Sequence, residues 1–155
     1  MTTSPDDRRR VAELLGREPS GSFVVAVRDA DGTPSVIRNH PFMSDGTPMP
    51  TLYWLCSREA THRVSQLEAG GGVDEAEAAV DPDELDRAHR AYAIERDYLI
   101  PRDHAGPRPS GGVAGTRTGV KCLHAHYAYH LAGGDDPVGR WVHNTLNPPQ
   151  SGATQ

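Results

Sequence analysis

The sequence predicts an α+β domain with a small antiparallel sheet of about three strands packed with three to four helices. Three observations support this prediction. First, β-prone runs occur early in the chain, at 23–27, 35–38 and 51–55. Second, helix-start signals precede the segments in which apolar residues recur at helical spacing. Third, an apolar fraction of 36% with 16 glycines and 13 prolines predicts many loops.

The first elements are a capped helix and a hairpin. Ser4 is the predicted N-cap, Asp7 follows three residues later as a capping-box acid, and Gly16 ends the helix. The first two strands are separated by Asp31 and Gly32, a pair typical of tight hairpin turns. The first two strands therefore pair antiparallel.

Three further segments complete the predicted fold. Ser57 caps a helix that ends at the glycine run 70–72, and Asp81 caps another that ends at Pro101. Near the C-terminus, a turn at 136–137 leads into a short amphipathic tail segment. In the predicted architecture these helices pack with the small antiparallel sheet.

The segment 119–130, GVKCLHAHYAYH, holds one of two cysteines and three of eight histidines. As a strand it places Cys122, His124, His126 and His130 on one face. As a helix it groups Cys122, His126 and His130 in one stripe, with His124 on the far side. The alanines within the segment and the two glycines after it favour the helix. Either interpretation brings Cys122, His126 and His130 together.

Length and charge restrict the class of protein. The 155 residues predict a single domain, 1–146, followed by a flexible tail, 147–155. No apolar run approaches the roughly 20 residues of a membrane-spanning helix, and no apolar signal core is present. The net charge of −5 argues against general nucleic-acid binding. We expect a cytoplasmic protein with free cysteines and no membrane association.

The clustered thiol and imidazole groups predict a metal site, with zinc as the candidate ion. Zinc takes three or four N, S or O ligands at about 2.0–2.3 Å, and Cys122 with His126 one turn later supplies two of them. His124 and His130 are further candidates, and Cys56 at a strand end is another. The alternative is that the cysteines are small buried apolar residues and the histidines form ordinary hydrogen bonds.

A catalytic thiol is a second interpretation of the same segment. Cys122 is expected about four residues inside a helix start and beside Lys121, which favours the thiolate. His126 would act as its base. The chain has neither a phosphatase-type Cys-x5-Arg loop nor a redox CxxC pair. Whether the protein is an enzyme stays open.

A third interpretation is an anion site in front of the predicted helix. The Gly-rich connection 102–118 leads into Gly119, and free N–H groups at a helix start bind anions. Arg117 and Lys121 would add positive charge for a small anionic ligand. A flexible linker ending in an N-cap at Thr118 is the alternative.

Five segments spread along the chain form a recognisable combination. They are VAELLGREPSG (11–21), DGTPMPTLYWL (45–55), VSQLE (64–68), GVKCLHAHYA (119–128) and GGDDPVG (133–139). Together they resemble the bacterial domain of unknown function 501 family. Genes of that family often lie near those for a septum-formation initiator and an exopolyphosphatase. The resemblance thus implies, by association only, an adaptor or regulator of cell division or phosphate metabolism that binds a protein partner through an exposed face.

The chain departs from the family pattern at two cysteines. Many members carry a cysteine in the first hairpin, where this chain has Asp29, and another two residues after TLYWL, where it has Ser57. If those cysteines bind zinc in relatives, this chain keeps Cys122 and His124 but needs other ligands. The expected replacements are Asp29, Cys56 and His126.

Overall fold

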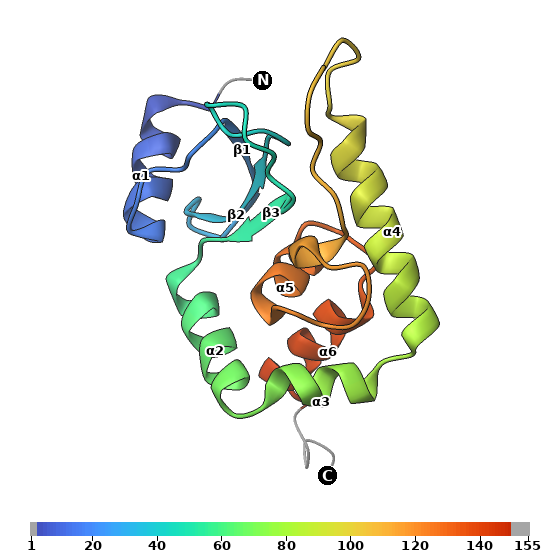
Figure 1. Ribbon diagram of the computed structural model, residues 1–155. Helices are drawn as coiled ribbons and strands as arrows, with labels where there is room; N and C mark the ends of the chain where they lie inside the picture. The colour runs from blue at the N-terminus through green and yellow to red at the C-terminus, as the bar shows by residue number, and fades with distance from the viewer. Residues whose placement is uncertain (1–2, 150–155) are drawn as a thin grey trace.

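The computed structural model describes residues 3–149 and confirms the α+β class (Figure 1). This part of the chain has a three-stranded sheet, six α-helices and one short 3-10 turn. In chain order the elements are α1 (Pro5–Leu15), β1 (Phe23–Arg28), β2 (Pro34–Asn39), β3 (Tyr53–Leu55), α2 (Arg58–Ala69), α3 (Gly72–Ala79), α4 (Pro82–Tyr98), η1 (Val113–Gly115), α5 (Leu123–Leu131) and α6 (Pro137–Leu146). No helix between residues 3 and 149 has both the length and the apolar character needed to cross a bilayer.

The sheet has the order β1-β2-β3 with both strand pairs antiparallel. The predicted hairpin turn at Asp31 and Gly32 is confirmed, and Gly32 has a φ of 89°, which glycine adopts without strain. The third strand is shorter than the predicted run 51–55 and pairs Leu55 with Val36 of β2. The central strand β2 is almost wholly buried, so both of its faces contribute to the protein interior.

The helices are more numerous than the predicted three to four because the chain after α2 is helical again. The glycine run 70–72 does not end the helical region. Gly71, with a φ of 93°, turns the corner, and α3 begins at Gly72. A Cβ atom at Gly72 would lie 2.6 Å from the carbonyl oxygen of Leu67, so this corner is tightly packed. The amphipathic segment expected after 136–137 is the ten-residue helix α6.

The C-terminal tail predicted at 147–155 lies mostly outside the described residues, and the single-domain bounds stay a prediction. Within residues 3–149, the larger apolar cluster joins β2 and β3 to α2–α6, and a smaller one lies between α1 and the sheet.

Helix α5 has the position from which a site can form. It packs against α6, β3, α2 and η1, and α2, α3 and α4 follow one another around it (Figure 1). The adjoining strand is fixed by Tyr92 of α4, whose buried phenol oxygen accepts the N–H groups of Leu52 at 2.6 Å and Tyr53 at 3.1 Å. The chain therefore holds the start of α5 close to both β3 and α2.

Candidate metal centre

Helix α5 begins later than the sequence predicts. Its first helical residue is Leu123, and Cys122 is the N-cap with extended φ and ψ of −147° and 118°. Cys122 therefore does not lie inside the helix, and the predicted stripe of Cys122, His126 and His130 does not form. The preceding run, 116–121, disfavours helix because Gly119 has a φ of 67° and three of its other residues are β-branched.

The late helix start brings Cys122 to His124 and to an acid from another helix. The sulfur of Cys122 lies 3.8 Å from Nδ1 of His124, and Oε1 of Glu68 lies 3.3 Å from the same nitrogen. All three ligand atoms lie within 4.8 Å of one another. Among residues 3–149, this trio is the group of potential metal ligands whose ligand atoms lie this close together.

The His124 ring is oriented so that one nitrogen faces the other two members of the trio. Its Nε2 lies 3.0 Å from Oγ of Ser65 and 3.3 Å from the carbonyl oxygen of Thr61. A carbonyl can only accept, so Nε2 carries the hydrogen and Nδ1 faces Cys122 and Glu68. The contact with Cys122, followed by the charge of Glu68, raises the pKa of His124, while partial burial opposes the rise.

Glu68 comes from the last turn of α2 and joins two helices. Its Oε2 accepts the N–H of Leu123 at 2.8 Å, so the carboxylate caps α5 from outside. This bond fixes the side chain and leaves Oε1 beside His124. The carboxylate is 27% exposed and the imidazole 25% exposed, which allows a small ion to reach them.

A cavity of about 330 Å³ opens beside the trio. Cys122 and His124 form part of its wall, and Tyr53 and Trp54 of β3 form another part. Arg17 also lines it, with its guanidinium 4.9 Å from the centre of the Trp54 ring. The cavity gives the thiol and imidazole a solvent-facing side.

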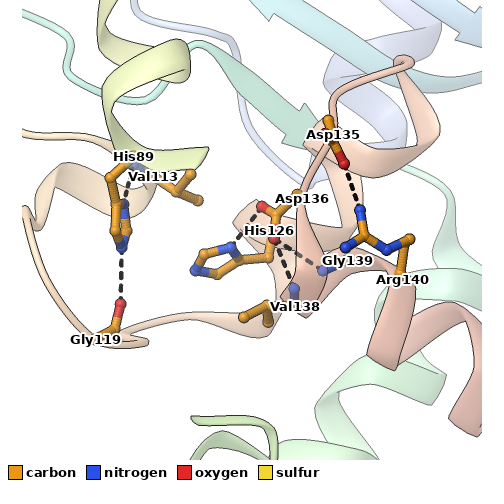
Figure 2. A network of polar contacts seen from close by, with 9 residues as sticks. All are labelled: His89, Val113, Gly119, His126, Asp135, Asp136, Val138, Gly139 and Arg140. Atoms are coloured by element: carbon orange, nitrogen blue, oxygen red, sulfur yellow. Dashed lines mark hydrogen bonds and ion pairs between the residues drawn. The ribbon is translucent and has the colours of Figure 1, made fainter. Parts of the chain in front are cut away.

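His126 lies in a different environment from His124, although the two are only two residues apart. Both His126 and Asp136 are fully buried, and His126 Nδ1 donates to Asp136 Oδ2 at 2.6 Å (Figure 2). The second oxygen of Asp136 accepts the N–H groups of Val138 and Gly139, so the same carboxylate caps α6. In the described residues, Nε2 of His126 has no hydrogen-bond partner. The predicted Cys122–His126 dyad is therefore not joined by a hydrogen bond.

The other two predicted ligands lie elsewhere. The ring of His130 stacks on Tyr127 and lies near His143, and burial lowers the pKa of His130. Cys56 is 2% exposed within the small cluster next to α1. Burial, together with the nearby charge of Asp29, raises the pKa of Cys56 to about 12. Cys56, His130 and Asp29 do not join the trio, and the two cysteines are unpaired.

The predicted anion cradle does not assemble in front of α5. The N–H groups of Val120 and Leu123 already donate to Glu77 and Glu68. The carbonyl oxygen of Gly119 accepts from His89 Nε2 at 2.9 Å. Lys121 is exposed, and Arg117 lines a cavity that neither Gly119 nor Lys121 lines.

Two acids, Glu68 and Asp136, distinguish these environments, and neither is among the site residues that the sequence predicts. Glu68 lies 55 positions before the N–H that it caps, so no local spacing reports it. Asp136 precedes a proline that starts α6, which is a recognisable N-cap signal, but that signal does not indicate the pairing with His126.

The family profile described as "Protein of unknown function (DUF501)" matches residues 25–144. The chain belongs to this family. The resemblance seen in the sequence is therefore confirmed, and the DUF501 match includes Glu68, Cys122 and His124. Comparisons with curated proteins and with solved structures found no match.

Proposed function

We propose that this DUF501 protein binds one zinc ion through Glu68, Cys122 and His124. A tetrahedral zinc site with bonds of about 2.0–2.3 Å has ligand-to-ligand separations of roughly 3.3–3.8 Å. The separations from His124 Nδ1 to the Glu68 oxygen and the Cys122 sulfur are 3.3 and 3.8 Å. This agreement is the observation that supports the proposal most directly.

The donor set also favours zinc over other ions. One sulfur, one nitrogen and one oxygen suit a borderline-soft ion, whereas magnesium and calcium prefer oxygen alone. The Thr61 carbonyl orients the His124 ring from behind, as the outer partners of zinc-binding histidines usually do. Metal ligands must be free of protons at the atom that binds, so zinc uptake by this site would release protons and weaken as the pH falls.

The site has three protein ligands and an open side, an arrangement typical of catalytic zinc. The open side would face the cavity, where Tyr53 and Trp54 supply an apolar wall and Arg17 a positive charge. Zinc in such a site polarises a bound water or substrate oxygen. We therefore extend the proposal to a metal-dependent site for a small ligand, with Arg17 holding its anionic part.

Metal analysis of the purified protein tests the proposal. We expect about one zinc equivalent per chain after purification without chelator, and a large loss in Cys122→Ser and Glu68→Gln. Cys56→Ser and His130→Gln are matched controls that keep the metal, because neither residue approaches the trio. Less than about 0.2 equivalents after incubation with equimolar zinc would contradict the proposal.

Cobalt substitution tests the geometry. Cobalt bound by one thiolate in a tetrahedral site gives sulfur-to-metal charge-transfer bands and strong visible bands. We expect both in the wild-type protein and in Cys56→Ser, and no charge-transfer band in Cys122→Ser. An octahedral spectrum would indicate a surface-bound ion.

The alternative is a protein-binding adaptor without metal. Ile94 and Tyr98, one turn apart on α4, are 70% and 88% exposed and would be its contact residues. A protein that is folded, free of metal and unaffected by added zinc would favour this alternative. Neither the zinc site nor the adaptor requires a disulfide. Free cysteines are typical of reducing compartments, which supports the proposed cytoplasmic location.

A further inference from the structure

A basic cavity, separate from the zinc site, lies between α4 and the loop 109–117. Its volume is about 360 Å³, and none of its wall residues lines the cavity beside Cys122. Arg90, Arg96 and Arg117 contribute to the wall, and Asp97 is the acid among them. The charged side chains of the wall are therefore mostly basic, although the chain has a net charge of −5.

Arg96 and Asp97 neutralise each other and hold the wall. Arg96 is 1% exposed, and its guanidinium lies 2.9 Å from the Asp97 carboxylate. It also donates to the carbonyl oxygens of Pro50 at 3.2 Å and Gly111 at 2.9 Å. Its donors are therefore occupied, and its role is to fix the loop against α4.

Arg90 and Arg117 have no such partners. Both are exposed, and neither forms an ion pair with any residue in the described range 3–149. One guanidinium group comes from α4 and the other from the loop, and both line the same cavity without an ion-pair partner in residues 3–149. Such groups bind anions through pairs of parallel N–H donors.

Both ring nitrogens of His89 fix the segment that carries Arg117. Nδ1 accepts the N–H of Val113 at 3.0 Å, and Nε2 donates to the carbonyl oxygen of Gly119 (Figure 2). Gly112 lies so close that a Cβ atom there would be 2.6 Å from the His89 ring. Arg117 thus lies between two anchored points, and the wall is ordered before any ligand arrives.

We propose that this cavity binds a small phosphorylated anion, with Arg90 and Arg117 as its charge partners. A phosphoryl group carries a charge of about −1.5 to −2, which matches two guanidinium groups, whereas one carboxylate would leave one of them unpaired. The volume admits the phosphoryl group and a small organic part. The proposal does not depend on zinc.

Calorimetric titration with inorganic phosphate, glycerol phosphate and succinate, at constant ionic strength, tests the proposal. We expect saturable phosphate binding that becomes about tenfold weaker in Arg90→Gln and in Arg117→Gln. Lys121→Gln is the matched control and keeps wild-type affinity, because Lys121 does not line the cavity. Tighter binding of glycerol phosphate identifies an organic phosphate as the ligand, and equal binding identifies free phosphate.

Three outcomes would overturn the proposal. One is the absence of saturable phosphate binding, and another is succinate binding as tight as that of phosphate. The third is a loss in Lys121→Gln equal to that in the arginine variants. Cys122→Ser separates this proposal from the zinc site: it must bind phosphate like the wild type, and a loss would place the anion at the metal.

Discussion

His124 and His126 lie two residues apart on α5, yet they have opposite environments. His124 is 25% exposed and faces a thiol and a carboxylate beside a cavity. His126 is fully buried and bonded to Asp136. One is the second residue of the helix and faces α2, while the other is the fourth and faces the segment before α6. The position of each histidine around the helix axis, more than its residue type, therefore decides which one can contact a ligand.

Asp136 and Glu68, the acids that contact these two histidines, have different roles. Asp136 accepts three hydrogen bonds inside the core, so its pair with His126 is closed to solvent. Glu68 uses one oxygen to cap α5 and keeps the other beside His124. The first pair suits stability, and the second suits the binding of an ion.

The largest expected effect is the loss of the buried pair. Asp136→Ala leaves the His126 Nδ1–H and two backbone N–H groups without an acceptor inside the core. We expect the free energy of unfolding to fall by about 3–5 kcal/mol, measured by urea denaturation. Asp135→Ala is the matched control, since its carboxylate is 95% exposed. Equal losses in the two variants would show that the buried pair does not stabilise the fold.

The next largest effect is expected at the proposed zinc site beside His124. Zinc at 100 times its dissociation constant should raise the free energy of unfolding by about 2.7 kcal/mol, because it binds only the folded chain. Cys122→Ser should lose this gain, and His130→Gln should keep it, as measured by thermal melts with and without zinc. A gain that persists in Cys122→Ser would move the ion away from Cys122.

Acid should weaken the fold through His89, whose ring lies 5.7 Å from that of His126. Burial is the main reason that the pKa of His89 is lowered, and the hydrogen bond to the Gly119 carbonyl opposes part of this effect. The unfolded chain binds this proton near pH 6.5 and the folded chain only at lower pH. Stability is therefore complete above about pH 6.5 and falls by up to about 1.4 kcal/mol per pH unit below it.

His89→Gln should flatten this part of the stability curve, measured by urea denaturation at pH 5 to 8. His62→Gln is the control because His62 is exposed. A curve for His89→Gln as steep as that of the wild type would assign the acid effect to other groups.

The sequence predicted the parts that depend on local signals. The caps at Ser4, Ser57 and Asp81, and the hairpin turn at Gly32, are all confirmed. Cys122 and His124, two members of the trio, are also among the site residues that the sequence predicts.

The partners of those residues could not be predicted. The i, i+4 stripe assumed that the helix includes Cys122, and a shift of the start to Leu123 removed it. Glu68 reaches the site through the tertiary contact between the last turn of α2 and the start of α5. A pattern of period 3.6 contains no information about such a contact.

The smallest effect is a difference in reactivity between the two cysteines, with no change in stability. Cys56 is 2% exposed and its pKa is about 12, so it stays a protonated thiol inside the core. Cys122 is partly exposed beside a cavity and His124. A chromogenic disulfide reagent should therefore modify one thiol quickly in the native protein and the second only after unfolding. Zinc should slow the fast reaction, Cys122→Ser should abolish it and Cys56→Ser should leave it unchanged. Two thiols that react quickly in the native protein would contradict the expected difference between the buried Cys56 and the accessible Cys122.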